Sequence, residues 1–134
     1  MTEFRRVLFR SLVTSLCLAV AVYAGSGKVA DISHADLQAA IAKKAVTVLD
    51  VNGSDSFAEG RIPGAIDFSA NGKKLAALLP KDKSALVVAY CGNEHCSAYQ
   101  AAASAAVALG YTNVKHYSPG IDGWKKSGAK IEKS

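Results

Sequence analysis

Short apolar runs along the chain predict the strands of a buried sheet. Residues 85–90 (ALVVAY) are almost entirely apolar, which is typical of a central parallel strand covered on both faces. Residues 45–50 (AVTVLD) form a second, β-branched run that ends in a carboxylate. Shorter runs at residues 65–68 and 114–117 predict two further strands.

Helices are predicted between and around these strands, over residues 33–44, 73–79, 97–109 and 120–126. Ser33 and Asp36 have the spacing of a capping box at the start of the first helix. Pro80 stops the second helix, and Gly110 closes the third, which is rich in alanine. Because strands and helices alternate, the sequence predicts an α/β domain with a mainly parallel central sheet and helices on both faces.

The first 24 residues have the pattern of a secretory signal peptide. Three arginines precede an uncharged stretch at residues 11–24, and Val22 and Ala24 place small residues at the −3 and −1 positions of a cleavage site. We therefore expect removal of residues 1–24, leaving one domain over residues 25–134 in a periplasmic or secreted protein. The alternative is a retained N-terminal membrane anchor. Fourteen residues span only about 21 Å of helix, less than a hydrocarbon core of ~30 Å, so cleavage without later stable membrane association is favoured.

Composition and charge narrow the class of protein. The chain has 134 residues, 50% of them apolar and 20% charged, which excludes two ordinary domains and a disordered chain. Its net charge of +5 falls to +3 without residues 1–24, which hold three Arg and one Glu. The remaining lysines stand in pairs without interleaved aromatic residues, so no nucleic-acid partner is expected. We expect a monomer.

Candidate chemistry is concentrated in residues 91–96 (CGNEHC), which we call the cysteine loop. This loop joins the central predicted strand to the alanine-rich helix, and ligands of parallel sheets bind at such strand ends, near helix N-termini. A thiol at Cys91 would be shifted toward the thiolate there, which makes Cys91 a candidate nucleophile. The alternative is that Cys91 is a buried small apolar residue.

Three stretches of the chain resemble signatures of the rhodanese-like domain family. The first covers residues 50–65 and includes GRIPGA. The second covers residues 88–111, from VAYC through the cysteine loop and the helix to GY, and the third begins with GIDGW at residues 120–124. Together the three stretches extend over about residues 31–133, in the family's order.

This resemblance implies a rhodanese-like fold and sulfur transfer. In that family the loop cysteine, here Cys91, attacks the outer sulfur of a donor such as thiosulfate, holds that sulfur as a persulfide, and passes it to a thiol or cyanide. Cys91 and Cys96 are therefore the candidate catalytic residues. The residues expected to bind the donor are Gly92, Asn93, Glu94, His95 and Ser97. The implied partners are a small sulfur donor and a thiol acceptor, including thiol proteins, and no cofactor is implied.

The cysteine loop departs from the family at its last position, where Cys96 replaces the usual arginine. The missing guanidinium and the neighbouring Glu94 disfavour an anionic donor such as thiosulfate. Cys96 has three interpretations: a disulfide partner of Cys91, a resolving thiol that attacks a persulfide or sulfenic acid at Cys91, or a residue that only packs beneath the loop. His95 either donates to a bound anion or is simply exposed.

Outside the loop, three residues differ from those common in the family, and two others are predicted to have structural roles. Asn52, Ser56 and Arg61 stand where the family often has an arginine, an acid and a histidine. Asp50 is predicted to brace the turn after its strand, and Trp124 is predicted to pack in the core.

The main hypothesis is an exported sulfurtransferase with Cys91 as the persulfide carrier. One alternative is a thiol–disulfide or redox protein that uses Cys91 and Cys96 as a pair. The other is a non-catalytic rhodanese-like module that binds a ligand or a partner protein. A metal site is not expected, because Cys91, His95 and Cys96 lack a fourth ligand from a second cluster.

Overall fold

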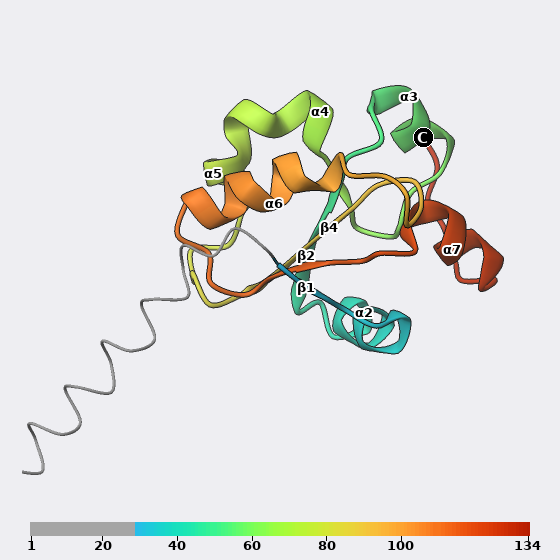
Figure 1. Ribbon diagram of the computed structural model, residues 1–134, viewed down its shortest axis with the longest axis horizontal. Coiled ribbons are helices and arrows are strands. Elements are labelled where there is room, and N and C mark those ends of the chain that lie inside the picture. The colour runs from blue at the N-terminus through green and yellow to red at the C-terminus, as the bar shows by residue number, and fades with distance from the viewer. Residues whose placement is uncertain (1–28) are drawn as a thin grey trace, which may run out of the picture.

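The computed structural model describes residues 29–134, which fold around a five-stranded sheet (Figure 1). The strands are β1 (Ala30–Asp31), β2 (Val46–Asp50), β3 (Ile66–Asp67), β4 (Leu86–Tyr90) and β5 (Val114–His116). Their order is β1-β5-β4-β2-β3, and every pair of neighbouring strands is parallel. The continuous apolar run at β4 therefore occupies the centre of the sheet, as predicted.

Helices cover both faces of this sheet (Figure 1). The helical elements are α2 (His34–Ala42), α3 (Ser54–Glu59), α4 (Phe68–Asn71), the 3-10 turn η2 (Gly72–Lys74), α5 (Leu75–Leu78), α6 (Tyr99–Ala108) and α7 (Gly120–Lys126). The helices α4, α5 and α6 lie on one face, whereas α2 and α7 lie on the other. The predicted α/β fold is confirmed.

The alternation of side chains along β4 divides the core into two halves. Val87 and Ala89 pack with three buried alanines of α6 on one face. Val88 and Tyr90 pack on the opposite face with Trp124 of α7 and with the buried Leu37 of α2. Because β4 is enclosed on both faces, the position of its carboxyl end, where the cysteine loop begins, is fixed by the core.

Some predicted boundaries differ from the structure. The strand predicted at residues 65–68 ends at Asp67, because its carboxylate accepts hydrogen bonds from the N–H groups of Ser69 (3.0 Å) and Ala70 (3.4 Å) and starts α4. The helix predicted at residues 73–79 is the turn η2 followed by α5. Neither β1 nor α3 was predicted; they contain only two and six residues.

The predicted signal peptide, residues 1–24, lies outside the described residues, so its removal and the export of the chain stay predictions. Over residues 29–134, no helix is both long enough and apolar enough to cross a bilayer.

Candidate active site

The cysteine loop lies at the carboxyl edge of the sheet. Cys91 directly follows β4, and Tyr90, the last residue of β4, pairs in register with Asp50, the last residue of β2. The start of α6 follows the loop after Ser97 and Ala98. This is the strand–loop–helix arrangement that the sequence predicted for a reactive thiol.

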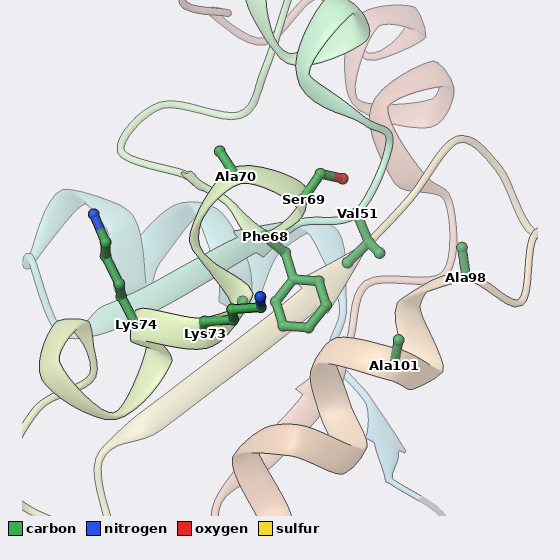
Figure 2. A pocket seen from close by; sticks show the side chains of 9 residues that line it. Val51, Phe68, Ser69, Ala70, Lys73, Lys74, Ala98 and Ala101 are labelled. Atoms are coloured by element: carbon green, nitrogen blue, oxygen red, sulfur yellow. The ribbon is translucent and has the colours of Figure 1, made fainter.

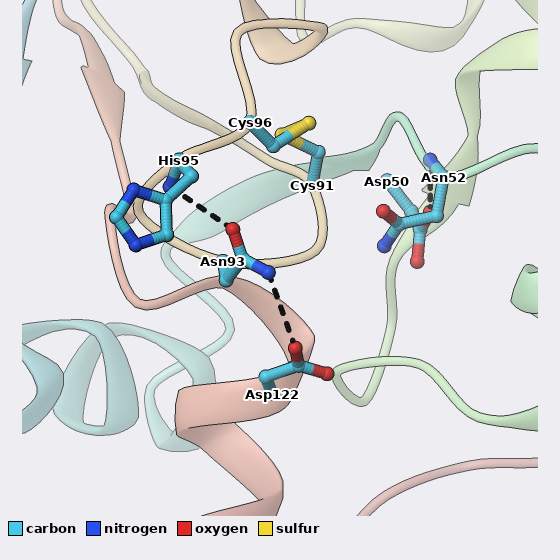
Figure 3. The surroundings of a disulfide bond; sticks show 7 residues. All are labelled: Asp50, Asn52, Cys91, Asn93, His95, Cys96 and Asp122. Atoms are coloured by element: carbon cyan, nitrogen blue, oxygen red, sulfur yellow. Dashed lines mark hydrogen bonds between the residues drawn. A yellow bond between two sulfur atoms is a disulfide. The ribbon is translucent and has the colours of Figure 1, made fainter.

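Cys91 and Cys96 are joined by a disulfide bond (Figure 3). Their Cα atoms are 6.4 Å apart, within the range of ordinary disulfides. The two residues differ in accessibility: Cys91 is 1% exposed, whereas Cys96 is partly exposed. The structure therefore pairs Cys96 covalently with Cys91; a resolving thiol would leave the same disulfide, so that role stays a prediction.

Asn93 organises the turn between the two cysteines. Its carbonyl accepts a hydrogen bond from the N–H of Cys96 (3.1 Å), and its side-chain Oδ1 accepts one from the N–H of His95 (2.9 Å). Its Nδ2 donates to Oδ2 of Asp122 on α7 at 3.4 Å (Figure 3). Asn93 therefore acts as an Asx-type brace that fixes the loop internally and ties it to α7.

The first turn of α7 holds the opposite side of the loop. The N–H of Ile121 donates to the carbonyl of Cys91 (2.9 Å), and the N–H of Asp122 donates to the carbonyl of Gly92 (3.0 Å). This approach requires glycine at position 120, which has φ +65°, because a Cβ there would lie 2.5 Å from the carbonyl oxygen of Cys91. The GIDGW motif is visible in the sequence, but its role in holding the loop was not predicted.

A buried polar group lies beside the loop. The hydroxyl of Tyr90 donates to Oδ2 of Asp50 and accepts a hydrogen bond from the N–H of Ile62 (3.1 Å). Oδ1 of Asp50 accepts a hydrogen bond from the N–H of Asn52 (2.9 Å), which is the bracing role expected from the sequence. Burial raises the pKa of the Asp50 carboxyl, against the opposing effect of the Tyr90 hydrogen bond. Burial, reinforced by the charge of Asp50, raises the pKa of the Tyr90 hydroxyl.

The amide of Asn52 points from the end of β2 toward the cysteine loop (Figure 3). Its Nδ2 is buried and has no hydrogen-bond partner among residues 29–134. Asn52 therefore places an unused donor beside the cysteine loop near Gly92, at a position for which the sequence predicted no role of its own.

The predicted donor-binding residues divide into two groups. Gly92 and Asn93 lie at the base of the loop, in contact with α7. Glu94, His95 and Ser97 are exposed; the side chains of Glu94 and His95 are 64% and 88% exposed, and His95 Nε2 lies 3.8 Å from Glu94 Oε1. His95 is therefore exposed, and its donation to a bound anion stays a prediction.

Two other residues singled out in the sequence lie away from the sulfur atoms. Arg61 contacts the C-terminal segment: its Nη1 donates to Oγ of Ser134 (2.8 Å), and its Nε lies 3.8 Å from Oε1 of Glu132. Trp124, on α7, is buried against His34 of α2, and its Nε1 donates to the carbonyl of Lys130 (2.8 Å). Trp124 therefore belongs to the core, as predicted.

A cavity of about 650 Å³ lies between the α4–η2 segment and α6 (Figure 2). Its lining residues are Val51, Phe68, Ser69, Ala70, Gly72, Lys73, Lys74, Ala98 and Ala101. Val51 and Ala98 connect this cavity to the active-site edge, because they follow β2 and the cysteine loop in the chain. The cavity was not predicted from the sequence, since its walls come from segments that are distant along the chain.

Comparison with known proteins finds solved structures with the same fold. A rhodanese-related protein from Thermoplasma volcanium is 28% identical, with 77% of this chain and 97% of that chain covered and a TM-score of 0.60. The human single-domain sulfurtransferase TSTD1 is 23% identical, with 74% and 97% covered and a TM-score of 0.57. A thiosulfate sulfurtransferase from Pseudomonas aeruginosa is 20% identical, with 78% of this chain but 20% of that chain covered and a TM-score of 0.61.

No curated protein matches the chain. The family model described as "Rhodanese-like domain" matches residues 33–127, which include β2 to β5, the cysteine loop and α7. The chain therefore belongs to the rhodanese-like domain family.

Proposed function

We propose that this protein is a sulfurtransferase in which Cys91 carries a sulfane sulfur as a persulfide. The observation that carries the proposal is the position of Cys91 at the carboxyl end of the central strand, in a loop braced by Asn93 and α7. Such a loop holds the sulfur at one point, so that a donor and an acceptor can reach it in turn. The names of two structural relatives, both sulfurtransferases, are consistent with this activity.

Reduction of the Cys91–Cys96 disulfide by an external dithiol, which is itself oxidised to a disulfide, is the first step of this proposal, because a disulfide sulfur cannot act as a nucleophile. The Cys91 thiolate then attacks the outer sulfur of a donor R–S–SH, forming Cys91–S–SH and releasing RS⁻. A thiol or cyanide acceptor takes the outer sulfur in the second half of the reaction and regenerates the Cys91 thiolate. Each half-reaction forms one bond to sulfur and breaks one, so no external oxidant is needed.

The charges around the loop disfavour a small inorganic dianion such as thiosulfate. Residues 91–97 include no lysine or arginine, and Glu94 adds an exposed carboxylate. Arg61, which stands where the family often has a histidine, contacts the C-terminal segment instead of the loop. We therefore propose small thiol persulfides as better donors than thiosulfate.

The proposed setting is an exported compartment, reached after removal of residues 1–24. A disulfide between Cys91 and Cys96 is compatible with such a setting, since disulfides persist in the periplasm and outside cells. There the folded domain of residues 25–134 would act as a monomer, with a small sulfur donor and a thiol or thiol protein as its partners.

A second candidate function is thiol–disulfide exchange, and the Cys91–Cys96 disulfide is the observation that favours it. The two functions differ in their need for Cys96. Exchange requires both cysteines, whereas formation of a persulfide requires Cys91 alone.

The test is the intact mass of the reduced protein after incubation with glutathione persulfide. The proposal predicts that Cys96→Ser gains one sulfur atom and transfers it to cyanide as thiocyanate, whereas Cys91→Ser gains none. The matched pair controls for general damage to the loop, because each variant loses one thiol. If Cys96→Ser gains no sulfur atom and the wild-type protein oxidises a dithiol substrate, the function is instead thiol–disulfide exchange.

A further inference from the structure

We propose that Cys96 is a resolving thiol that displaces the sulfur carried by Cys91 as sulfide. This inference rests on the proposed function, since it needs a persulfide at Cys91. It makes the chain a reductase of thiol persulfides that releases hydrogen sulfide, in addition to transferring sulfur to an external acceptor. The Cys91–Cys96 disulfide is then the product of each reductive cycle.

The geometry needed for this step already exists in the loop. The two sulfur atoms are bonded while the Cα atoms are 6.4 Å apart, so Cys96 reaches Cys91 without a different backbone conformation. Hydrogen bonds that do not involve sulfur fix both ends: Cys91 and Gly92 are held by α7, and the N–H of Cys96 is held by Asn93. Because none of these bonds involves a sulfur atom, we expect them to persist on reduction and to keep the Cys96 thiol at a high effective concentration beside Cys91.

The chemistry balances within the loop. The Cys96 thiolate attacks Sγ of Cys91 in Cys91–S–SH, the Cys91–Cys96 bond forms, the bond to the outer sulfur breaks, and HS⁻ leaves. Two electrons from the two cysteine thiols reduce the sulfane sulfur to sulfide. With the first step, R–S–SH and the reduced protein give RSH, hydrogen sulfide and the disulfide protein.

An external dithiol must then restore the two thiols, and the difference in accessibility specifies where it attacks. In the disulfide form Cys91 is 1% exposed, whereas Cys96 is partly exposed, so an incoming thiolate reaches the sulfur of Cys96 more readily. Attack on Cys96 gives a mixed disulfide and releases the Cys91 thiolate inside the loop. The second thiol of the dithiol resolves the mixed disulfide, leaving an oxidised dithiol and the reduced protein.

A single-turnover experiment tests the inference. The protein is reduced, freed of reductant and mixed with one equivalent of glutathione persulfide; sulfide is then measured, and the peptide containing Cys91 and Cys96 is examined by mass. Wild-type protein should release about one equivalent of sulfide and lose two hydrogens without retaining sulfur. Cys96→Ser and Cys96→Ala should retain the sulfur and release sulfide at least tenfold more slowly, with Cys91→Ser as the background.

The outcomes separate this inference from the proposed function. Wild-type protein that retains the added sulfur, with Cys96 still free and no sulfide above the Cys91→Ser background, overturns the resolving role but leaves the sulfurtransferase proposal intact. If neither wild-type protein nor either Cys96 variant takes up sulfur, both proposals fail. Two different Cys96 variants are used so that misfolding of one does not decide the result.

Discussion

At Gly120, the first residue of α7, the backbone closely approaches the cysteine loop, and Gly120→Ala is expected to displace that loop. A Cβ at this position would lie 2.5 Å from the carbonyl oxygen of Cys91 and 2.6 Å from both the carbonyl carbon and the oxygen of Gly92. All three neighbours are backbone atoms, so no side-chain rotation relieves the overlap. The loop or α7 must move, and the hydrogen bonds from Ile121 and Asp122 are lost or weakened.

The expected loss of stability has two parts. Alanine at φ +65° costs about 1 kcal/mol because of its own backbone conformation. The two hydrogen bonds to the loop contribute roughly 1 kcal/mol each, so Gly120→Ala should lower the free energy of unfolding by about 3 kcal/mol. Gly128→Ala is the matched control: Gly128 has φ +82°, but a Cβ added there would meet no atom within 4 Å, so only the cost of about 1 kcal/mol applies.

Urea unfolding of the oxidised proteins measures this difference. The fluorescence of Trp124, the single tryptophan, reports the transition because its side chain is buried against His34 of α2. The displaced loop should also slow re-formation of the disulfide in the reduced variant. Equal stabilities of the Gly120 and Gly128 variants, within about 0.5 kcal/mol on the scale of ordinary surface substitutions, would refute the claim that α7 holds the loop through this close approach.

Three further changes test the buried groups and the last loop position. Tyr90→Phe should lower the free energy of unfolding by about 2–3 kcal/mol, because the buried N–H of Ile62 and the buried carboxylate of Asp50 lose their partner. Tyr99→Phe is the control: the hydroxyl of Tyr99 makes no hydrogen bond among residues 29–134, so this change should cost less than about 0.5 kcal/mol. Burial lowers the pKa of His116, against a smaller opposing effect of Asp31. The contribution of His116 to the free energy of unfolding should therefore be fully present above the ordinary histidine pKa of about 6.5. It should be lost as the pH drops through the lower pKa of the folded state. His116→Phe should flatten the pH dependence of urea midpoints in this window, and an unchanged slope would contradict the assignment. Cys96→Arg should have a kcat/KM for thiosulfate at least tenfold above that of Cys96→Ser, because arginine makes charge-assisted hydrogen bonds to the anion. The rate is measured as sulfite release. Equal values for the two variants would contradict a role for charge at this position.

The sheet could be predicted from the sequence because its central strands are long apolar runs. Residues 85–90 and 45–50 each contain enough buried apolar side chains to outweigh the local conformational preferences of single residues. Both runs form strands of the parallel sheet, β4 and β2, as predicted. The element β1 has only two residues and depends on pairing with β5, so it leaves no local pattern. The helix α3 is bounded by Gly53 and Gly60, has no side-chain cap and buries no residue, so neither periodicity nor capping indicated it.

The candidate site was predictable only as far as local spacing determines it. The two cysteines and the intervening loop are contiguous in sequence, and their position after the central strand followed from the strand itself. The contact of Gly120 with Cys91 joins residues 29 positions apart, and the cavity beside α6 joins three segments. Such contacts depend on how the two faces of the sheet are covered, which the sequence specifies only through the completed fold.

The identity of the residue at position 96 determines what the loop can do with a bound sulfur. An arginine there would place a fixed cation beside the persulfide anion, stabilise that anion and attract anionic donors, so that the sulfur waits for an acceptor. A cysteine provides no charge to hold the anion, but it supplies a nucleophile that is already within bonding distance of Cys91. The backbone contacts from Asn93 and α7 serve either residue equally well, because none of them involves the side chain at position 96. If the proposed chemistry is right, one substitution within the same scaffold separates storage of the sulfur from its reductive release. The lifetime of the persulfide in Cys96→Arg should then be longer than in wild-type protein.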